Sequence, residues 1–308
     1  MIAADARLAA KTLAAGDLII LPTETVYGLA ADAANPAAVV RLYEAKGRPR
    51  FNPLIAHVAD IAMAVRVARL DARALRLADA FWPGPITFVA PIAEVDLVCD
   101  LARAGLDTVA VRAPAHAMAH AVIEAFARPI VAPSANRSGR PSPTTFTDAV
   151  DETGEDAAIA LDGGSCAIGL ESTVVALLDG PPRLLRPGAI TRAEIEALVG
   201  PLAEAEADAV RSPGRLARHY APNAPVRLDA EAALPGEAYL AFGPAPRDAR
   251  VFNLSPSSDL REAAARLFSS LRAADALCPV AIAVAPIPQG GLGEAINDRL
   301  RRAAGYVG

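Results

Sequence analysis

The chain has 308 residues, of which 53% are hydrophobic and 21% charged, so it can bury sizeable cores and is not a disordered chain. Its formal net charge of −5 argues against a general nucleic-acid binder. The three cysteines are scattered and form no CxxC pair, which argues against a disulfide or zinc framework and suits a reducing cytosol.

The sequence also argues against a membrane protein. No charge-free apolar run approaches the roughly 18 residues that a spanning helix needs. The N-terminus has an acid at Asp5 and no basic lead into an apolar segment, so it does not resemble a signal peptide. We therefore expect a cytoplasmic protein without a membrane partner.

Helix and strand signals alternate over the first two hundred residues. Asn35 is the expected N-cap of a helix that begins at Pro36, and Thr191 with Glu194 forms a capping box. Helices are predicted at 3–15, 36–45, 71–82 and 115–127, and strands at 17–21, 54–58, 86–92, 108–114, 129–132, 157–164, 171–179 and 183–188. This mixture of βα and hairpin signals predicts an α/β fold with a mixed sheet.

A break follows between about Pro201 and Pro225, where periodicity is lost and Ser-Pro-Gly and Ala-Pro appear, as is typical of a linker. Beyond it, strands are predicted at 226–230, 238–243, 251–255 and 280–285, and helices at 259–274 and about 293–304. The chain therefore divides into a main domain at 1–200, a linker at 201–225 and a small α/β domain at 226–308.

The segment PTETVYG follows the strand at 17–21. Ligands of open α/β sheets bind at the carboxyl ends of strands, so a site is expected here. Thr23, Thr25 and Tyr27 alternate, and in an extended segment they would share one face. The alternative is a polar turn that closes on Gly28.

The segment KGRPRFNPL is basic. Pro49 disfavours helical geometry at Arg48, and an extended chain would place Lys46, Arg48 and Arg50 on one side. Such cations attract phosphate, and arginine can bind two oxygens at once. The alternative is a solvated basic loop; the neighbouring motifs favour the phosphate site.

The segment PIVAPSANRSGRPSPTTF ends a strand at Ala132. Ser134 and Asn136 then alternate, and Ser142 follows in a proline-flanked run. Small hydroxyl and amide groups after a strand suit phosphate and ribose contacts, although the same composition is common in turns. The chain has neither GxxxxGK[ST] nor GxGxxG, so a nucleotide site would be of another kind.

Together and in this order, the segments resemble the YrdC-like family in its long two-domain form, threonylcarbamoyl-AMP synthase. The resemblance covers nearly the whole chain. The matching motifs are PTETVYGL, Lys46-x-Arg48, NPL, Ser134-x-Asn136, VRAP, GRPSPT, ESTVV, RPGAI, the linker SPGRLARHYAP and GLGEAINDRLRRAA. Each motif alone is weak, but the ordered set is specific. Arg215 stands where methionine is expected, a difference that concerns linker docking and not the core site.

The resemblance implies a YrdC-like twisted mixed sheet with flanking helices and a smaller, Rossmann-like C-terminal domain. It also implies a nucleotidyltransferase that forms L-threonylcarbamoyladenylate and pyrophosphate from L-threonine, bicarbonate or CO2, and ATP, for threonylcarbamoyladenosine modification of tRNA. The threonine amine would take up CO2, and the carbamate oxygen would attack the α-phosphate, so no protein nucleophile is needed. Catalysis would come from positioning and charge stabilisation.

The resemblance further implies partners and residue roles. Magnesium is expected with the triphosphate, and a downstream threonylcarbamoyl transferase is implied by the pathway. The predicted catalytic set is Lys46, Arg48, Ser134 and Asn136. ATP is expected to contact Arg48, Asn52, Thr108, Ser134, Ser142, Arg186, Tyr220 and Asn223. L-Threonine is expected to contact Thr25, His57, Arg112, Ala132 and Ser172, with Arg112 on its carboxylate.

Alternatives stay open at this point. His219, Tyr220 and Asn223 could form a lid or a passive tether. His116, His120 and Glu124 have a spacing that could bind metal, but helical residues four apart share a face by geometry alone, so no metal site is predicted. Other functions would be carbamoyl transfer through carbamoyladenylate, which would require zinc-finger cysteines, or double-stranded RNA binding with a steep salt dependence.

Overall fold

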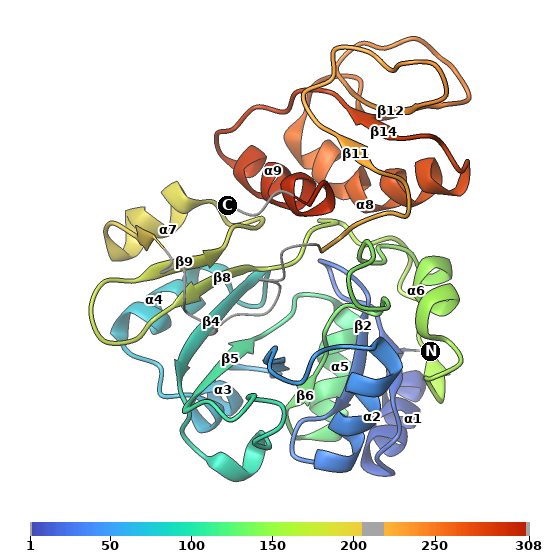
Figure 1. Ribbon diagram of the computed structural model, residues 1–308. Coiled ribbons are helices and arrows are strands. Elements are labelled where there is room, and N and C mark those ends of the chain that lie inside the picture. Colours follow the sequence, from blue (N-terminus) through green and yellow to red (C-terminus); the bar gives the residue numbers. More distant parts are fainter. Residues whose placement is uncertain (1, 205–218, 306–308) are drawn as a thin grey trace.

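The computed structural model describes residues 2–204 and 219–305, and Arg215 lies outside them. Two sheets organise this part of the chain (Figure 1). The strands of the larger sheet are β1 (Ile19–Leu21), β2 (Gly28–Asp32), β3 (Ile55–His57), β4 (Ile86–Pro91), β5 (Thr108–Arg112), β6 (Ile130–Val131), β7 (Ile159–Ala160), β8 (Thr173–Ala176), β9 (Arg183–Arg186) and β10 (Ala203–Glu204). Their order is β10-β9-β8-β4-β5-β3-β6-β2-β1-β7.

The larger sheet is mixed, as predicted. Strand β3 runs parallel to β5 and antiparallel to β6, so residues from three separate motifs meet along it. Its helices are α1 (Ile2–Ala14), α2 (Pro36–Lys46), α3 (Ile61–Val67), α4 (Ala72–Phe81), α5 (Ala117–Phe126), α6 (Phe146–Thr153) and α7 (Arg192–Val199). Helices α1 and α5 pack together in one apolar cluster with β1 and β6, and a separate, larger cluster includes residues of α2, α3 and α4.

Local signals account for several helix ends. Asn35 accepts hydrogen bonds from the amides of Ala37 and Ala38 at the start of α2, and Thr191 with Glu194 forms the capping box of α7, as predicted. All the predicted helices and strands are present, although several strands are shorter than expected. Strands β2 and β10 and helices α3 and α6 were not predicted, and β10 falls within the segment 201–225 that was predicted to be a linker.

The second sheet has β11 (Val226–Arg227), β12 (Ala238–Phe242), β13 (Val251–Ser255) and β14 (Ile282–Val284), all parallel, in the order β11-β14-β12-β13. Helix α8 (Leu260–Ala276) joins β13 to β14, and α9 (Leu292–Ala303) follows β14. This Rossmann-like arrangement agrees with the prediction. We call the larger sheet with helices α1–α7 the first unit, and the smaller sheet with α8 and α9 the second unit. In Figure 1, α8 and α9 lie between the smaller sheet and the first unit.

The two units share buried surface. The apolar core of the second unit includes Val26 and Leu170 of the first. A side chain at Gly169, whose φ is +75°, would place its Cβ 2.5 Å from the Cα of Ala265 in α8, so glycine is required for this close approach.

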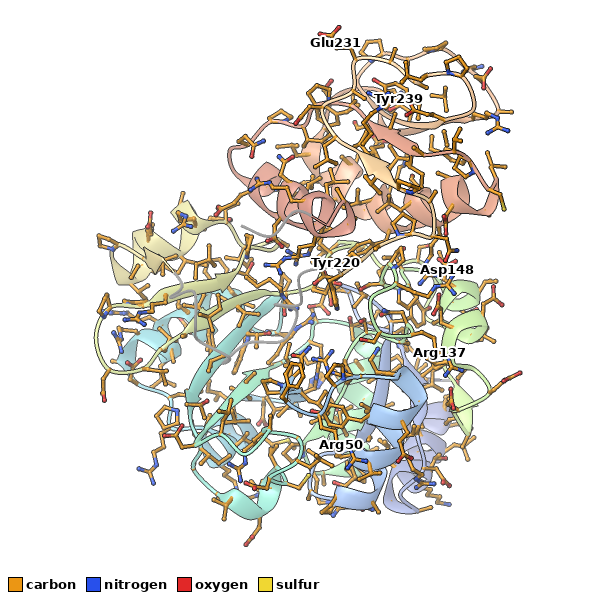
Figure 2. The ribbon with its side chains drawn as sticks, viewed as in Figure 1. Arg50, Arg137, Asp148, Tyr220, Glu231 and Tyr239 are labelled. Carbon is orange, nitrogen blue, oxygen red and sulfur yellow. The ribbon has the colours of Figure 1, made fainter. Side chains whose placement is uncertain are left out.

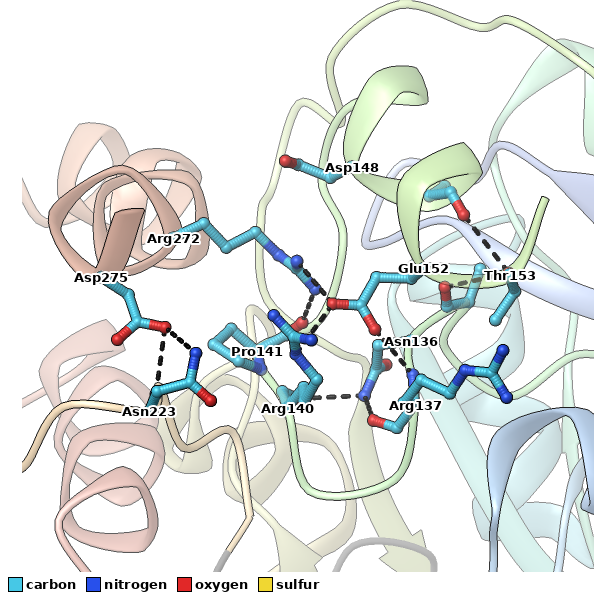
Figure 3. Close-up of polar contacts among 12 residues, drawn as sticks. Asn136, Arg137, Arg140, Pro141, Asp148, Glu152, Thr153, Asn223, Arg272 and Asp275 are labelled. Atoms are coloured by element: carbon cyan, nitrogen blue, oxygen red, sulfur yellow. Dashed lines mark hydrogen bonds and ion pairs between the residues drawn. The ribbon is translucent and has the colours of Figure 1, made fainter. Parts of the chain in front are cut away.

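Polar contacts add to the interface (Figure 3). Arg272 of α8 donates to Glu152 of α6 at 2.8 Å and to the carbonyl of Pro141. Asn223 donates through its side chain to Asp275 of α8 at 2.9 Å. Within the described residues, no helix is both long and apolar enough to cross a membrane.

Candidate active site

A cavity runs along β3, where the loops that follow β1 and β6 meet the carboxyl end of β5. Most of the predicted site residues line it. The lining residues are Thr25, Val26, Arg48, Pro53, Leu54, Ile55, His57, Arg112, Ala132, Pro133, Ser134, Glu171, Ser172, Arg186, His219 and Tyr220. The space amounts to about 510 Å³ with its open mouth included. Three arginines and one glutamate are the charged side chains among them.

Arg112 is held on several sides at the carboxyl end of β5. It donates to Glu24 at 2.6 Å, to the Thr25 hydroxyl at 2.9 Å and to the Gly84 carbonyl at 3.2 Å. Burial tends to raise the pKa of Glu24, but the charge and hydrogen bond of Arg112 hold it below its ordinary value. Arg112 is therefore rigidly placed, and its charge is already balanced by a carboxylate.

His57 faces the same end of the cavity. Its Nδ1 lies 3.1 Å from the Ile55 carbonyl, and since a carbonyl only accepts, Nδ1 carries the proton and Nε2 is the acceptor. Burial, reinforced by the charge of Arg112, lowers the pKa of His57 to about 3. The ring is therefore neutral at physiological pH and offers one lone pair.

The turn PTETVYG positions Thr25. The Thr23 hydroxyl donates to the Val26 carbonyl and lies 2.8 Å from the Thr25 hydroxyl, so the segment is a compact turn. The prediction that Thr23, Thr25 and Tyr27 share one extended face was wrong. Tyr27 turns away and donates to the Gly164 carbonyl at 2.6 Å. The backbone instead forms the polar turn that was the alternative interpretation. Thr25 nevertheless lines the cavity, as expected of a site residue.

Arg48 reaches the cavity by a different geometry from the predicted one. Helix α2 continues to Lys46, and Gly47 follows in the left-handed region with φ 57°. The amides of Gly47 and Arg48 bond back to Glu44 and Tyr43, which is a Schellman motif. Consequently the side chains on either side of Gly47 diverge. The predicted one-sided row of cations was wrong.

Arg48 itself is partly buried, and its hydrogen bonds go to neutral groups. It donates to the carbonyls of Asn52 at 3.3 Å and Pro53 at 3.2 Å. Burial lowers the pKa of Arg48 to about 10, so it remains a cation at neutral pH. Arg50, by contrast, has a side chain 60% exposed and pairs loosely with Glu44 at 3.7 Å.

Lys46 lies behind the cavity and does not line it. Its ammonium group donates to the carbonyls of Ser134 and Asn136, and the residue is only 2% exposed. Burial, followed by the charge of Arg48, holds the pKa of Lys46 well below its usual range. The structure therefore uses Lys46 to join the end of α2 to the loop that presents Ser134.

Arg186 and Ser172 form a second polar group. Arg186 donates to the Ser172 carbonyl at 3.0 Å and hydroxyl at 3.1 Å, and that hydroxyl lies 2.7 Å from the Thr87 hydroxyl. Among the described residues, neither Arg48 nor Arg186 forms an ion pair with a carboxylate. The cavity therefore contains two cations, the buried Arg186 and the partly exposed Arg48, whose hydrogen bonds go to neutral groups, while Glu171 attracts Arg186 at longer range.

His219 and Tyr220 close the cavity from the linker. Both are buried, their rings meet edge to face with centroids 4.0 Å apart, and Tyr220 lies at the junction of the two units (Figure 2). Tyr220 also packs on Phe268 of α8. Burial lowers the pKa of His219 to about 3, so it too is neutral.

Several predicted residues lie outside the cavity. Asn52 and Asn136 support it through backbone carbonyls, and the buried Ser142 hydroxyl donates to Glu171. Asn223 is exposed and bonds to Asp275 instead. Thr108 lies at the opposite end of β5 from Arg112, where it lines a different cavity, so its assignment to ATP depends on the family resemblance alone.

Glu171 was not predicted as a site residue. It lines the cavity and is 7% exposed, and it forms an ion pair at 2.9 Å with Arg299 of α9. A glutamate at the start of the predicted strand 171–179 was the available signal, because glutamate is rarely buried without a partner. The partner, 128 residues away, could not be read from the sequence.

The described residues contain no group of three or more His, Cys, Asp or Glu side chains that could hold a metal ion. The cavity's one carboxylate, Glu171, has both oxygens engaged, by Ser142 and by Arg299. On helix α5, His120 and Glu124 lie 3.7 Å apart on an exposed face, and His116 caps the helix.

Comparison with known proteins identifies the family of the chain. A family model described as "Telomere recombination", covering Sua5, YciO and YrdC proteins, matches residues 11–188, and a model described as "Threonylcarbamoyl-AMP synthase, C-terminal domain" matches residues 190–305. The threonylcarbamoyl-AMP synthase of Pyrococcus abyssi is 41% identical over 97% of this chain and 94% of its own length. That of Bacillus subtilis is 43% identical over 71% of this chain and 65% of its own length.

The fold agrees with that of a solved relative. The crystal structure of P. abyssi Sua5 complexed with L-threonine superposes with a TM-score of 0.91 at 40% identity, over 99% of this chain and 95% of that one. The match extends over both units, and the family models together span nearly the whole chain. The chain therefore belongs to the Sua5/YciO/YrdC family, in the form that carries the threonylcarbamoyl-AMP synthase C-terminal domain.

Proposed function

We propose that this chain forms L-threonylcarbamoyladenylate and pyrophosphate from L-threonine, bicarbonate or CO2, and ATP. The observation that carries the proposal is the charge arrangement of the cavity. The buried Arg112 forms an ion pair with a carboxylate, whereas the buried Arg186 and the partly exposed Arg48 donate their hydrogen bonds to neutral groups. Such a cavity suits an amino acid at one end and a polyphosphate at the other.

The amino-acid end is formed by Thr25, His57 and Arg112, with Ala132 and Ser172 beside them. Arg112 spends single N–H groups on Glu24, Thr25 and Gly84 and keeps others for the threonine carboxylate. The neutral His57 offers Nε2 as an acceptor for the hydroxyl or the amine of threonine. These contacts would orient the amine for carbamate formation.

The polyphosphate end is formed by Arg48, Arg186 and Ser134, with Tyr220 over them. The carbamate oxygen would attack the α-phosphate, the bond from this phosphorus to the β-phosphate oxygen would break, and pyrophosphate would leave. The two cations oppose the charge that develops on the phosphorus oxygens and the leaving group. No side chain needs to form a covalent bond.

Magnesium enters in this proposal as part of the MgATP substrate. The described residues do not offer a carboxylate cluster for it, and Mg²⁺ commonly binds through substrate phosphates and retains several waters. Lys46 and Asn136 act indirectly, because they hold the loop of Ser134.

We place the reaction in the cytoplasm, where it would supply a threonylcarbamoyl transferase that modifies tRNA. Three free cysteines suit a reducing compartment. His219 and Tyr220 would act as a lid, since among the described linker residues these two line the cavity. Addition of ATP and L-threonine should then protect the linker from limited proteolysis, and equal cleavage would argue for a passive tether.

A double-stranded RNA-binding module is less compatible with the charge distribution. Lys46 is buried, and the exposed arginines of the basic motifs each pair with an acid: Arg50 with Glu44, Arg137 with Asp156 and Arg140 with Glu152. Carbamoyl transfer through carbamoyladenylate would use carbamoyl phosphate instead of threonine. Zinc-finger cysteines accompany that activity, and this chain has three scattered cysteines and no CxxC pair.

Pyrophosphate release from ATP tests the proposal. Release should require both L-threonine and bicarbonate, and the adenylate should contain carbon from labelled bicarbonate. Release that does not need threonine, or that needs carbamoyl phosphate, would contradict the proposal.

A further inference from the structure

We propose that Arg299 of the second unit is a positioning residue for the nucleotide: it neutralises Glu171 in the lining of the cavity, so that a polyphosphate can bind beside that carboxylate. The inference depends on the proposed function only for the identity of the nucleotide. It assigns a specific contribution to α9, which otherwise lies outside the cavity.

The geometry ties Arg299 to the cavity by several bonds. Arg299 donates to the Glu171 carboxylate at 2.9 Å, to the Pro187 carbonyl at 2.8 Å and to the carboxylate of the neighbouring Asp298 at 2.8 Å, and its side chain is 0% exposed. Asp298 also pairs with Arg302 at 3.1 Å, so it has a second cation, whereas Arg299 is the cation that contacts Glu171. The guanidinium lies 5.4 Å from the centre of the Tyr220 ring. It therefore touches three segments that surround the cavity, namely those of Glu171, Pro187 and Tyr220.

The second oxygen of Glu171 accepts the hydrogen bond of Ser142. Burial tends to raise the pKa of Glu171, but the charges of Arg299 and Arg186 and the bonds from Ser142 and Arg299 hold it below its ordinary value. The carboxylate is therefore ionised in the lining of a cavity that has to accept an anion. Without the ion pair with Arg299, the Glu171 carboxylate would repel a polyphosphate and would partly neutralise the positive charge of Arg186.

The position of Arg299 is not explained by adhesion between the units alone. Elsewhere on α9, Glu294 pairs with Arg192 at 3.1 Å, with side chains 35% and 28% exposed, and neither residue lines the cavity. A buried ion pair is a poor source of net stability, because desolvation opposes the attraction between the charges. The Arg299–Glu171 pair is buried at the cavity. It is better explained by the neutralisation of the Glu171 charge than by stability.

The test compares Arg299→Met with Glu294→Gln, a control on the same helix that also breaks a contact between the units. Calorimetric titration of the full chain with ATP, without threonine, gives Kd, and pyrophosphate release gives KM for each substrate. We expect Arg299→Met to weaken ATP binding about tenfold or more, with the KM for threonine within about twofold. Glu294→Gln should leave both unchanged.

A double variant separates charge from structure. In Glu171→Gln/Arg299→Met the cavity lining carries no uncompensated carboxylate, and Asp298, the other carboxylate that Arg299 contacts, keeps its ion pair with Arg302, so most of the ATP affinity should return. Glu171→Gln alone should bind ATP as tightly as the wild type or more tightly, since the negative charge in the cavity lining is removed while Arg299, still paired with Asp298, stays in place. This single variant also keeps the inference testable if Arg299→Met does not fold, which thermal melts would reveal.

Unchanged ATP affinity in folded Arg299→Met, a double variant no tighter than Arg299→Met, or weaker binding in Glu171→Gln would each overturn the inference. A parallel titration with inorganic triphosphate gives the Kd of a polyanion that has no nucleoside. This Kd measures the effect of charge on binding independently of turnover. If the wild type binds the polyanion but releases no pyrophosphate with threonine and bicarbonate, the proposed function fails, while the comparison of Kd values still decides the role of Arg299.

Discussion

On one side of the cavity Arg112 is bound to the carboxylate of Glu24, whereas on the other side Arg48 and Arg186 are bound to carbonyls and a hydroxyl. The first arrangement is neutral as a unit and suits an amino acid, whose own charges cancel. The second leaves positive charge for a polyanion. The groups that an arginine of the cavity contacts therefore indicate the kind of ligand better than the presence of the arginine does.

The largest effect should come from removing an arginine of the polyphosphate side. Arg48→Met should lower kcat/KM for ATP by about 100-fold, because a buried charge-assisted contact with the phosphates is lost. The KM for L-threonine should change much less. Steady-state pyrophosphate release measures both constants, and an equal rise of the two KM values would contradict the division of the cavity into two sides.

A smaller effect is expected on the threonine side. Arg112→Met should raise the KM for L-threonine by about 30-fold, since the substrate carboxylate loses its charged partner. It should also destabilise the chain, because Glu24 is left buried without a cation. Calorimetric binding of L-threonine provides the check, and an unchanged threonine affinity would show that the carboxylate lies elsewhere.

The two sides should behave alike towards acid, since each contains a neutral histidine. His57 and His219 have pKa values of about 3 in the folded chain and near 6.5 when unfolded. Between these values the unfolded state binds more protons, so stability is full above about pH 6.5 and falls on acidification by up to about 1.4 kcal/mol per pH unit for each histidine. Urea unfolding at pH 7, 6 and 5 measures the slope.

Replacement of either histidine tests the origin of this slope. His219→Asn and His57→Asn should each make the pH dependence shallower, by about one proton's contribution. If both variants keep the wild-type slope, the acid sensitivity comes from other groups.

The smallest effect should come from the one arginine of the basic motif that points outward. Arg50→Met should leave both KM values within about twofold and stability within about 0.5 kcal/mol, since exposed ion pairs contribute little. It is the matched control for Arg48→Met, two residues away. A loss comparable to that of Arg48→Met would mean that the motif acts as a whole.

The sequence predicted the fold where local rules are strong. Asn35 and the Thr191–Glu194 capping box mark helix ends correctly, and alternating signals indicate a mixed sheet. Strand β2 was missed because GLAAD has no β-branched residue and follows a turn signal. The preference for extended geometry before Pro49 says little about Lys46, which α2 retains through its cap at Gly47.

The site was predictable as a set of motifs but not as a geometry. Even spacing places Thr108 and Arg112 on one face of β5, yet they lie about 13 Å apart along it and in different cavities. Glu171 was missed because its burial depends on a partner from another unit. Pairings across more than a hundred residues leave no local trace in a single sequence.

The distance along the chain between Glu171 and Arg299 has a consequence for synthesis. Domains generally fold in order as they leave the ribosome, so the larger sheet can assemble while α9 has yet to be made. The partner of Glu171 arrives 128 residues later. Until then the carboxylate faces the future nucleotide site without Arg299, so nascent chains and chains truncated before α9 that fold should bind ATP more weakly than the full chain.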